Sequence, residues 1–183
     1  MLKADMKRPL VKALAGAMLL FSHYSLALSS DTEQPIHIQS ESQHLDMATN
    51  TVTFTQDVVL TQGSIKILAD KLIVIRLEGK DGSETIEAYG KPATFEQTMD
   101  DGKQIHGEAN KLRYEVGNEY LKMSTNAMLE QSGNQVEGNV ITYEIDKQQL
   151  VAESDSNKRV TTILQPTSKK NSSNNDSSES DAE

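Results

Sequence analysis

Residues 52–70, VTFTQDVVLTQGSIKILAD, alternate apolar and polar side chains on both sides of the segment Gln62-Gly63-Ser64. Alternation with a period of two predicts strands with one apolar and one polar face, and the central glycine predicts a turn that folds the second strand back on the first. Comparable turn signals recur at intervals of roughly eight to twelve residues along the chain. They are Thr49-Asn50, Asp81-Gly82, Asp101-Gly102, Gly117-Asn118, Gly133-Asn134 and Asp146-Lys147. This rhythm predicts an all-β, antiparallel fold, either a sandwich or a roll.

The chain also contains a loose repeat. Each unit has an apolar residue, a small residue two positions later, then an acidic or amide residue, and an apolar residue seven positions after the first. The units run from Ile38 to Leu45, from Ile67 to Val74, from Ile105 to Leu112 and from Val136 to Tyr143. We expect each unit to be a strand with a corner at the small residue, and we expect Pro35 and Pro92 at strand starts or sheet edges.

The residues expected to point inward are almost all medium-sized aliphatics, because the chain has three Phe, five Tyr and no Trp. Two interpretations stay open. Medium side chains from two sheets about 10 Å apart can fill the space between them completely. Alternatively, the sandwich is held partly open and its aliphatic lining accepts an apolar ligand. Leu45, Leu72 and Leu129 are expected to belong to a sealed core.

The two termini differ from the body. Lys3, Lys7, Arg8 and Lys12 precede a short apolar stretch, and Ser25-Leu26-Ala27 is a small-x-small site, so residues 1–27 are predicted to be a secretory signal peptide cleaved after Ala27. A retained membrane anchor is the alternative. Residues 165–183, rich in Ser, Asn and acids, have too little apolar surface to fold and are predicted to be a disordered tail. The folded domain is therefore expected within residues 28–164.

Charge and composition exclude several functions. The net charge of −9 argues against nucleic-acid binding, and the absence of Cys excludes a thiol nucleophile or Cys-ligated zinc. The four His residues show no metal-ligand spacing, and no phosphate-binding glycine loop or nucleophile motif is present. The carboxylates are scattered over polar strand faces. We therefore predict no metal, no cofactor and no enzymatic activity.

Two short strands at the ends of the fold are candidates for assembly. They are the first strand, Pro35, Ile36, His37, Ile38 and Gln39, and the last, Arg159, Val160, Thr161, Thr162, Ile163 and Leu164. Edge strands present unpaired backbone groups, which proteins usually shield. Either these edges are covered or solvated, or they pair with another copy or a partner of like fold. Pairing of the first strand of one copy with the last strand of another is a heterologous contact that produces open filaments.

Four stretches carry a resemblance to a known family. They are DTEQPIHIQS (31–40), LDMATNTVTFTQDVVLTQGSIKILADKL (45–72), YGKPATF (89–95) and SDSNKRVTTILQP (154–166). They closely resemble the OstA-like family of periplasmic lipopolysaccharide transport proteins of Gram-negative bacteria. The resemblance covers nearly the whole chain between the signal peptide and Pro166, and the tail falls outside it.

The resemblance implies a twisted antiparallel β-jellyroll, open at both ends like an open-ended sandwich, with a hydrophobic interior groove. It implies a periplasmic protein that binds the lipid A part of lipopolysaccharide and joins head to tail with copies of itself into a bridge. That bridge is fed by an inner-membrane transport complex through a like-folded subunit, and it delivers to an outer-membrane translocon. The residues expected to contact acyl chains are Ile36, Ile38, Val52, Phe54, Phe95, Tyr114 and Val116, for each of which plain core packing is the alternative.

Two alternative functions stay open. The first is a structural adaptor that joins envelope proteins by strand addition and carries no lipid. The second is an enzyme acting on envelope glycans or lipids, for which the sequence offers no catalytic pair.

Overall fold

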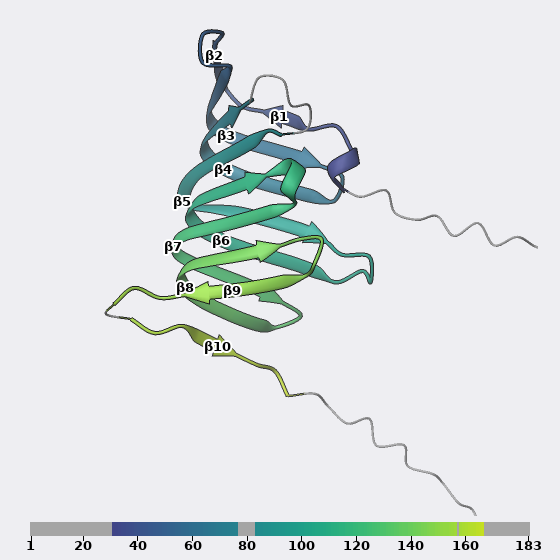
Figure 1. Cartoon of the computed structure of the whole chain (residues 1–183), viewed down its shortest axis with the longest axis vertical. Helices are drawn as coiled ribbons and strands as arrows, with labels where there is room; N and C mark the ends of the chain where they lie inside the picture. The colour runs from purple at the N-terminus through teal and green to yellow at the C-terminus, as the bar shows by residue number, and fades with distance from the viewer. Residues whose placement is uncertain (1–30, 77–82, 157, 167–183) are drawn as a thin grey trace, which may run out of the picture.

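The computed structural model describes residues 31–76, 83–156 and 158–166, and these form a ladder of antiparallel strands (Figure 1). Two short 3₁₀ helices, η1 (Asp31–Glu33) and η2 (Val116–Asn118), accompany the strands. The strands are β1 (His37–Gln39), β2 (Ser42–Asp46), β3 (Thr51–Gln62), β4 (Ile65–Ile75), β5 (Thr85–Thr98), β6 (Gln104–Glu115), β7 (Tyr120–Gln131), β8 (Asn134–Glu144), β9 (Gln149–Glu153) and β10 (Thr161–Ile163). The prediction of an all-β fold is confirmed.

Each long strand pairs with the next one along the chain, so the sheet is a meander. The order is β1-β3-β4-β5-β6-β7-β8-β10, with β2 also paired to β3 and β9 also paired to β8. The first and last strands therefore lie at opposite ends of the ladder, as Figure 1 shows. Both are shorter than the sequence predicted.

The long strands turn a corner near their middle, and this converts one sheet into two facing layers. Every neighbouring pair from β3 to β8 has a register shift at that level, for example between Thr55 and Val58 in β3. We call the layer that contains β1 and β10 half-sheet I, and the layer that contains β2 and β9 half-sheet II. Half-sheet I holds residues 58–62, 65–68, 93–98, 104–108, 127–131 and 134–138 of β3–β8, and half-sheet II holds residues 51–55, 71–75, 85–89, 111–115, 120–124 and 140–144. This arrangement is a β-jellyroll.

The sequence repeat falls on the alternate strands β4, β6 and β8, and the predicted corner at the small residue occurs in β4 but not in β6. In β6, Gly107 pairs with Phe95 and Leu129, and the interruption begins after Glu108. In β4 the register shift falls between Leu68 and Lys71, at the small residue Ala69. Two inward residues of an unbroken strand are separated by an even number of positions, so a spacing of seven requires an interruption. Ile67 and Val74 are both buried, on opposite sides of such an interruption.

Other strands turn the same corner with different residues. Gln56 and Asp57 in β3, and Thr125 and Asn126 in β7, have positive φ angles between 47° and 69°. Asn and Asp tolerate this left-handed conformation better than most residues, which explains two of the four positions. The sequence repeat does not include these strands, because their bend is made by backbone conformation rather than by a small residue.

The prediction for Pro92 is wrong. Pro92 lies in the interior strand β5, between β4 and β6, rather than at an edge. It is tolerated there because it sits at the corner, where the ladder between β5 and β6 is interrupted from Tyr89 to Ala93. Residue 90, two positions earlier, is a glycine because a Cβ added there would lie 2.7 Å from the Pro92 carbonyl oxygen.

The two half-sheets pack their inner faces into one apolar core. It includes Leu60, Ile67 and Phe95 from half-sheet I and Leu72 and Ile86 from half-sheet II, none more than 1% exposed. The Tyr114 hydroxyl of half-sheet II donates a hydrogen bond to Gln62 Oε1 of half-sheet I over 3.2 Å. The two layers are therefore in direct contact.

Most of the predicted turns occur where expected, including those at Gly63, Gly102 and Gly133, which have positive φ angles that favour glycine. The Asp81-Gly82 turn, the signal peptide and the tail from residue 167 onward lie outside the described residues. Within the described ranges, no helix is long and apolar enough to cross a membrane.

Candidate functional site

Strand pairing places inward side chains in rows that run the whole length of the ladder. In half-sheet I, successive register partners on the inner face connect β1 to β10. This row consists of Ile38, Leu60, Ile67, Phe95, Gly107, Leu129, Val136 and Thr162. We call it row I.

Half-sheet II carries two parallel rows that connect β2 to β9. Row IIa consists of Leu45, Val52, Val74, Ile86, Tyr114, Leu121, Tyr143 and Leu150. Row IIb consists of Gln43, Phe54, Leu72, Ala88, Leu112, Met123, Ile141 and Ala152. The three rows face one another across the interior, and nearly all of their members are aliphatic or aromatic.

The interior is filled in the middle of the ladder. Gly107 in row I has no side chain because Met123 of row IIb occupies the space, with its sulfur 2.8 Å from the position of an added Cβ. Burial raises the pKa of the Tyr114 hydroxyl well above its usual range, and the nearby carboxylates of Glu119 and Asp31 act in the same direction. The Tyr114 hydroxyl therefore stays protonated and donates its hydrogen bond to Gln62 Oε1.

The rows become accessible toward the ends. The β1–β3 end exposes part of Ile38 and Phe54, which pack against the core without being fully covered. Leu45 is 53% exposed, so the expectation that it belongs to a sealed core is wrong. It pairs with Val52 on the inner face, but β2 is the last strand of half-sheet II and no further strand covers it.

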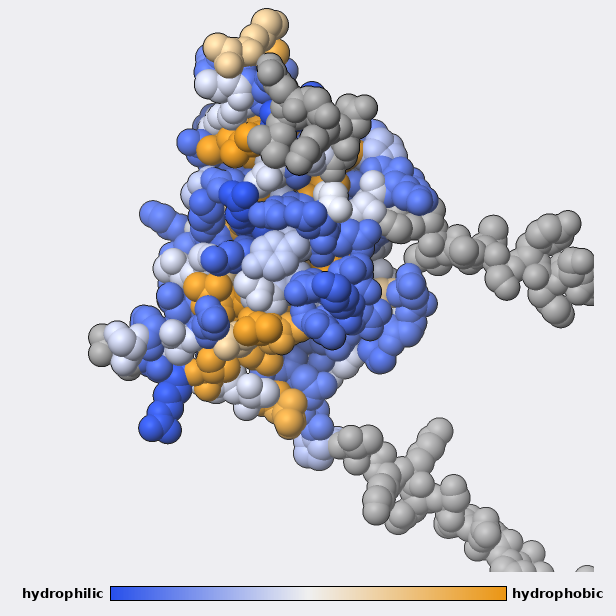
Figure 2. All heavy atoms as spheres, in the orientation of Figure 1, coloured by the Kyte–Doolittle hydropathy of each residue, from blue (hydrophilic) through white to orange (hydrophobic). Residues whose placement is uncertain are grey.

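The β9–β10 end is also apolar at its surface. Leu164 is 73% exposed and Val160 38% exposed, and both share the strand face of Thr162, the last residue of row I. Ile163 and Val151 lie exposed on the opposite, outer face. Figure 2 shows apolar side chains gathered over the β8–β10 end of the molecule.

The seven predicted acyl-chain contacts divide into two groups by depth. Ile36, Ile38, Val52 and Phe54 are half-buried near the β1–β2 end, whereas Phe95 and Tyr114 are completely buried and Val116 is 5% exposed. Five of the seven belong to the three rows, and Ile36 and Val116 flank them. Whether any of them binds lipid stays a prediction.

The predicted assembly residues lie at the two ends of the ladder. In the first strand Pro35, His37 and Gln39 are exposed and alternate with half-buried Ile36 and Ile38. In the last segment all six residues, from Arg159 to Leu164, are exposed. Three β10 residues pair with β8, and the other edge of β10 has no neighbour in the sheet.

Sequence reasoning missed one polar residue of the interior, Gln62. Its side chain is 2% exposed, although its position at the end of an alternating strand beside a glycine turn suggested a solvated turn. Its Nε2 atom donates to the carbonyl oxygens of Thr32 and Gln34, over 3.3 and 3.2 Å. The sequence signal for its burial was its position two residues after the inward-facing Leu60, since residues two positions apart in a strand face the same side.

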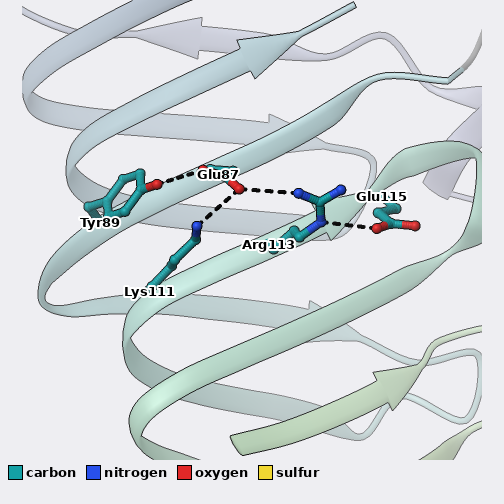
Figure 3. Close-up of polar contacts among 5 residues, drawn as sticks. All are labelled: Glu87, Tyr89, Lys111, Arg113 and Glu115. Carbon is teal, nitrogen blue, oxygen red and sulfur yellow. Dashed lines mark hydrogen bonds and ion pairs between the residues drawn. The ribbon is translucent and has the colours of Figure 1, made fainter. Parts of the chain in front are cut away.

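A charged cluster covers the outer face of half-sheet II, on β5 and β6 (Figure 3). The Glu87 carboxylate accepts hydrogen bonds from Tyr89, from Lys111 over 3.0 Å and from Arg113 over 3.2 Å, and Arg113 also donates to Glu115. Partial burial acts to raise the pKa of Glu87, but these three donors and the Lys111 charge outweigh it and lower the pKa. The cluster is on the side away from the rows, and its visible effect is to fasten β5 to β6.

This geometry defines a class: a meandering β-jellyroll whose apolar interior runs from one open end to the other. A family model described as "LptA/(LptD N-terminal domain) LPS transport protein" matches residues 37–149. The chain belongs to this family of lipopolysaccharide transport proteins, as the sequence resemblance indicated.

Individual relatives agree with this assignment. The chain is 47% identical to the lipopolysaccharide export system protein LptA of Escherichia coli K12 over 153 residues, which cover 84% of this chain and 83% of the relative. It is 48% identical to LptA of Haemophilus influenzae over 152 residues, or 82% and 88% of the two chains. A crystal structure of Pseudomonas aeruginosa LptH, described as the LptA-homologous periplasmic component of the lipopolysaccharide transport device, superimposes with a TM-score of 0.70 at 29% identity. It covers 75% of this chain and 100% of that one.

Proposed function

We propose that this protein carries lipopolysaccharide through the periplasm with the acyl chains held between the two half-sheets. The observation that carries the proposal is the continuity of the apolar rows, which begin in half-exposed Ile38 and exposed Leu45 and run through the core toward β9 and β10. An interior that is apolar along its whole length and uncovered at both ends is suited to a ligand that passes through rather than one that is stored.

The energetics favour such a carrier. Each exposed CH₂ group costs roughly 0.8 kcal/mol in water, so one acyl chain of about a dozen carbons costs on the order of 10 kcal/mol. A protein that moves such chains through an aqueous compartment has to cover them continuously. Rows of similar aliphatic contacts suit movement along the interior, because no single position binds much more tightly than the next.

The proposed lipid contacts become engaged in order of depth. Acyl chains first meet the half-buried residues near the β1–β2 end, Ile36, Ile38, Val52 and Phe54. Phe95, Tyr114 and Val116 are reached only when the half-sheets separate, because in the closed form these residues fill the middle of the interior. The sugars and phosphates stay outside, in water.

The proposal includes head-to-tail assembly. The edge segment Pro35–Gln39 of one copy pairs with the edge segment Arg159–Leu164 of the next, so that row I continues from copy to copy. The same two edges would contact a like-folded subunit of the inner-membrane complex and the outer-membrane translocon. The chain enters the periplasm through its signal peptide, cleaved after Ala27, and the proposal assigns it no catalytic step and no cofactor.

One observation favours a second function. The middle of the interior is filled by the protein's own side chains, with Phe95 and Tyr114 completely buried. An adaptor that joins envelope proteins by strand addition and carries no lipid needs only the edges and a sealed core. Detection of lipid at inward positions separates the two functions.

The test is photo-crosslinking at adjacent positions of one strand. A photoreactive residue at Ile38, which faces the interior, is expected to attach lipopolysaccharide under transport conditions. The same residue at His37, which is exposed on the opposite face, is the matched control and is expected to attach little. Equal labelling at the two positions, or none at Ile38, contradicts the groove assignment and leaves the adaptor function.

A further inference from the structure

Residues Asp31–Gln34, which we call the strap, lie across the open side of the jellyroll, where the hairpin turns of the two half-sheets approach each other. In Figure 1 the strap's helix η1 (purple) lies at that side of the ladder, beside the end of β3. The strap is separated from β1 by Pro35 and Ile36 and takes part in no strand pairing. Its polar contacts hold it there.

The strap is attached firmly to half-sheet I. The Asp31 carboxylate accepts hydrogen bonds from the backbone N–H of Ser64 over 2.6 Å, from the Ser64 hydroxyl over 2.8 Å and from Gln97 Nε2 over 3.0 Å. The Gln62 amide donates to the Thr32 and Gln34 carbonyls. All of these partners belong to half-sheet I or its turns, and bonds to a carboxylate are stronger than neutral ones.

The strap also contacts half-sheet II. The Thr32 hydroxyl donates to Glu119 Oε1 over 3.0 Å, and Glu119 lies in the turn between β6 and β7. Directly beneath, Gln62 of half-sheet I accepts the bond from Tyr114 of half-sheet II. These two side-chain bonds cross the mouth between the two layers, and each has a single hydroxyl donor.

Apolar side chains of both half-sheets meet at a cavity beside the strap. A cavity of about 150 Å³ at the mouth is lined by Ile65 and Met99 from the half-sheet I side and by Tyr143 and Ile145 from the half-sheet II side. The rest of its lining is polar and consists of Asp31, Thr32, Gln97, Thr98, Asp100, Glu119, Asp146 and Gln148. Tyr143 also belongs to row IIa, so separation of Thr32 from Glu119 would open this cavity toward the buried rows.

We propose that the strap is a latch on the lateral mouth of the interior: it remains on half-sheet I, and breaking of the Thr32–Glu119 contact lets the half-sheets part and admits acyl chains from the side. This inference rests on the proposed lipid-carrying function and adds a second route of entry, distinct from the ends of the ladder. Fixing the latch to half-sheet II should block loading, whereas fixing it to half-sheet I should not.

The experiment uses two double-cysteine variants of the mature chain, in which no natural Cys competes for the reagent. Thr32→Cys with Glu119→Cys, joined by a short bifunctional thiol reagent such as dibromobimane, ties the strap across the mouth. Asp31→Cys with Ser64→Cys, treated in the same way, ties it to half-sheet I only and is the matched control. Uptake of purified lipopolysaccharide is followed by displacement of a fluorescent fatty-acid probe.

Cross-linking across the mouth is expected to slow lipopolysaccharide uptake by about tenfold or more relative to the same variant before cross-linking, whereas the control should change by less than about twofold. Thr32→Ala, which removes one hydroxyl donor, should speed uptake by about fivefold. Undiminished uptake after cross-linking 32 to 119, or an unchanged rate in Thr32→Ala, overturns the latch while leaving the lipid-carrying function intact. Failure of all untreated variants and the natural chain to bind lipopolysaccharide overturns the proposed function and the latch with it.

Discussion

The proposed head-to-tail assembly predicts that a charge placed on either exposed end of the rows weakens self-association. Leu164, at the β10 end, is 73% exposed, and full burial of a Leu side chain contributes roughly 2.5 kcal/mol, so its burial by a neighbouring copy contributes about 2 kcal/mol. Loss of that contribution in Leu164→Asp corresponds to roughly a 30-fold higher dissociation constant. Leu45 is 53% exposed at the β2 end, so its burial by a neighbouring copy contributes about 1.3 kcal/mol. Loss of that contribution in Leu45→Asp corresponds to roughly a tenfold higher dissociation constant.

The assay is sedimentation velocity of the mature protein over a range of concentrations. Asn110→Asp, which adds the same charge at an exposed position in the middle of the ladder, is the control and should associate like the natural chain. A mixture of Leu45→Asp and Leu164→Asp chains is the decisive sample. Each variant retains one intact end, so the mixture should form dimers of one chain of each kind and no longer filaments.

Two results refute this reasoning. If both variants associate as strongly as the natural chain, the exposed apolar ends do not form the contact. If both variants are monomeric and their mixture is also monomeric, the contact is not head to tail, because a contact between unlike ends has to be restored by mixing.

Three further outcomes follow from the interior and the outer cluster. Glu87→Gln should lower the free energy of unfolding by about 1–3 kcal/mol in urea at pH 7, against less than about 1 kcal/mol for Glu144→Gln in the exposed pair with Lys147. Folding lowers the pKa of Glu87, so the ionised carboxylate stabilises the folded protein above the pKa that Glu87 has in the unfolded chain. This stabilisation is lost as the pH falls through the pKa of Glu87 in the folded protein. A stability difference between Glu87→Gln and the natural chain that grows on acidification would contradict this. Phe95→Ala should lower the free energy of unfolding by about 3–5 kcal/mol, because Phe95 is completely buried in row I. A decrease below about 1 kcal/mol would mean that the interior is already open. Gly107→Val should lower the free energy of unfolding by about 1–3 kcal/mol, as measured by thermal unfolding, because the new side chain displaces the Met123 sulfur. Gly107→Ala should lower it less, because the Met123 thioether is flexible. Equal stability of both variants and the natural chain would show that the half-sheets do not touch at Gly107.

The latch and the end-to-end contact use neighbouring residues of the same segment. The strap ends at Gln34, and β1 begins at His37 with only Pro35 and Ile36 between them. A copy that pairs with the β1 edge therefore contacts the chain close to the latch. The two sets of experiments separate these roles, because the cysteine pairs leave β1 unchanged and Leu45→Asp leaves the strap unchanged.

Local pattern was sufficient for the strands, for most of the turns and for the corner of β4. Alternation fixed which side chains point inward, because successive residues of a strand face opposite sides. The seven-residue spacing from Ile67 to Val74 indicated an interruption in β4 that the structure places at Ala69. The family resemblance supplied the jellyroll, which alternation alone did not distinguish from a sandwich.

Tertiary structure decided how deeply each inward residue is buried. Leu45 and Leu72 have the same phase and the same side chain, yet one is 53% exposed and the other 0%, because β2 is the last strand of its layer and β4 has neighbours on both sides. The prediction of Pro92 at a strand start or a sheet edge follows from a rule that holds for straight strands and fails at a corner. Gln62 and the strap are separated by about thirty residues in the sequence. The hydrogen bonds between them form only when the tertiary fold places the strap beside the end of β3. The sequence by itself therefore determined which strand faces are apolar, since this depends on neighbouring residues. The continuous rows, their uncovered ends and the strap across the mouth exist only once distant strands are aligned in register.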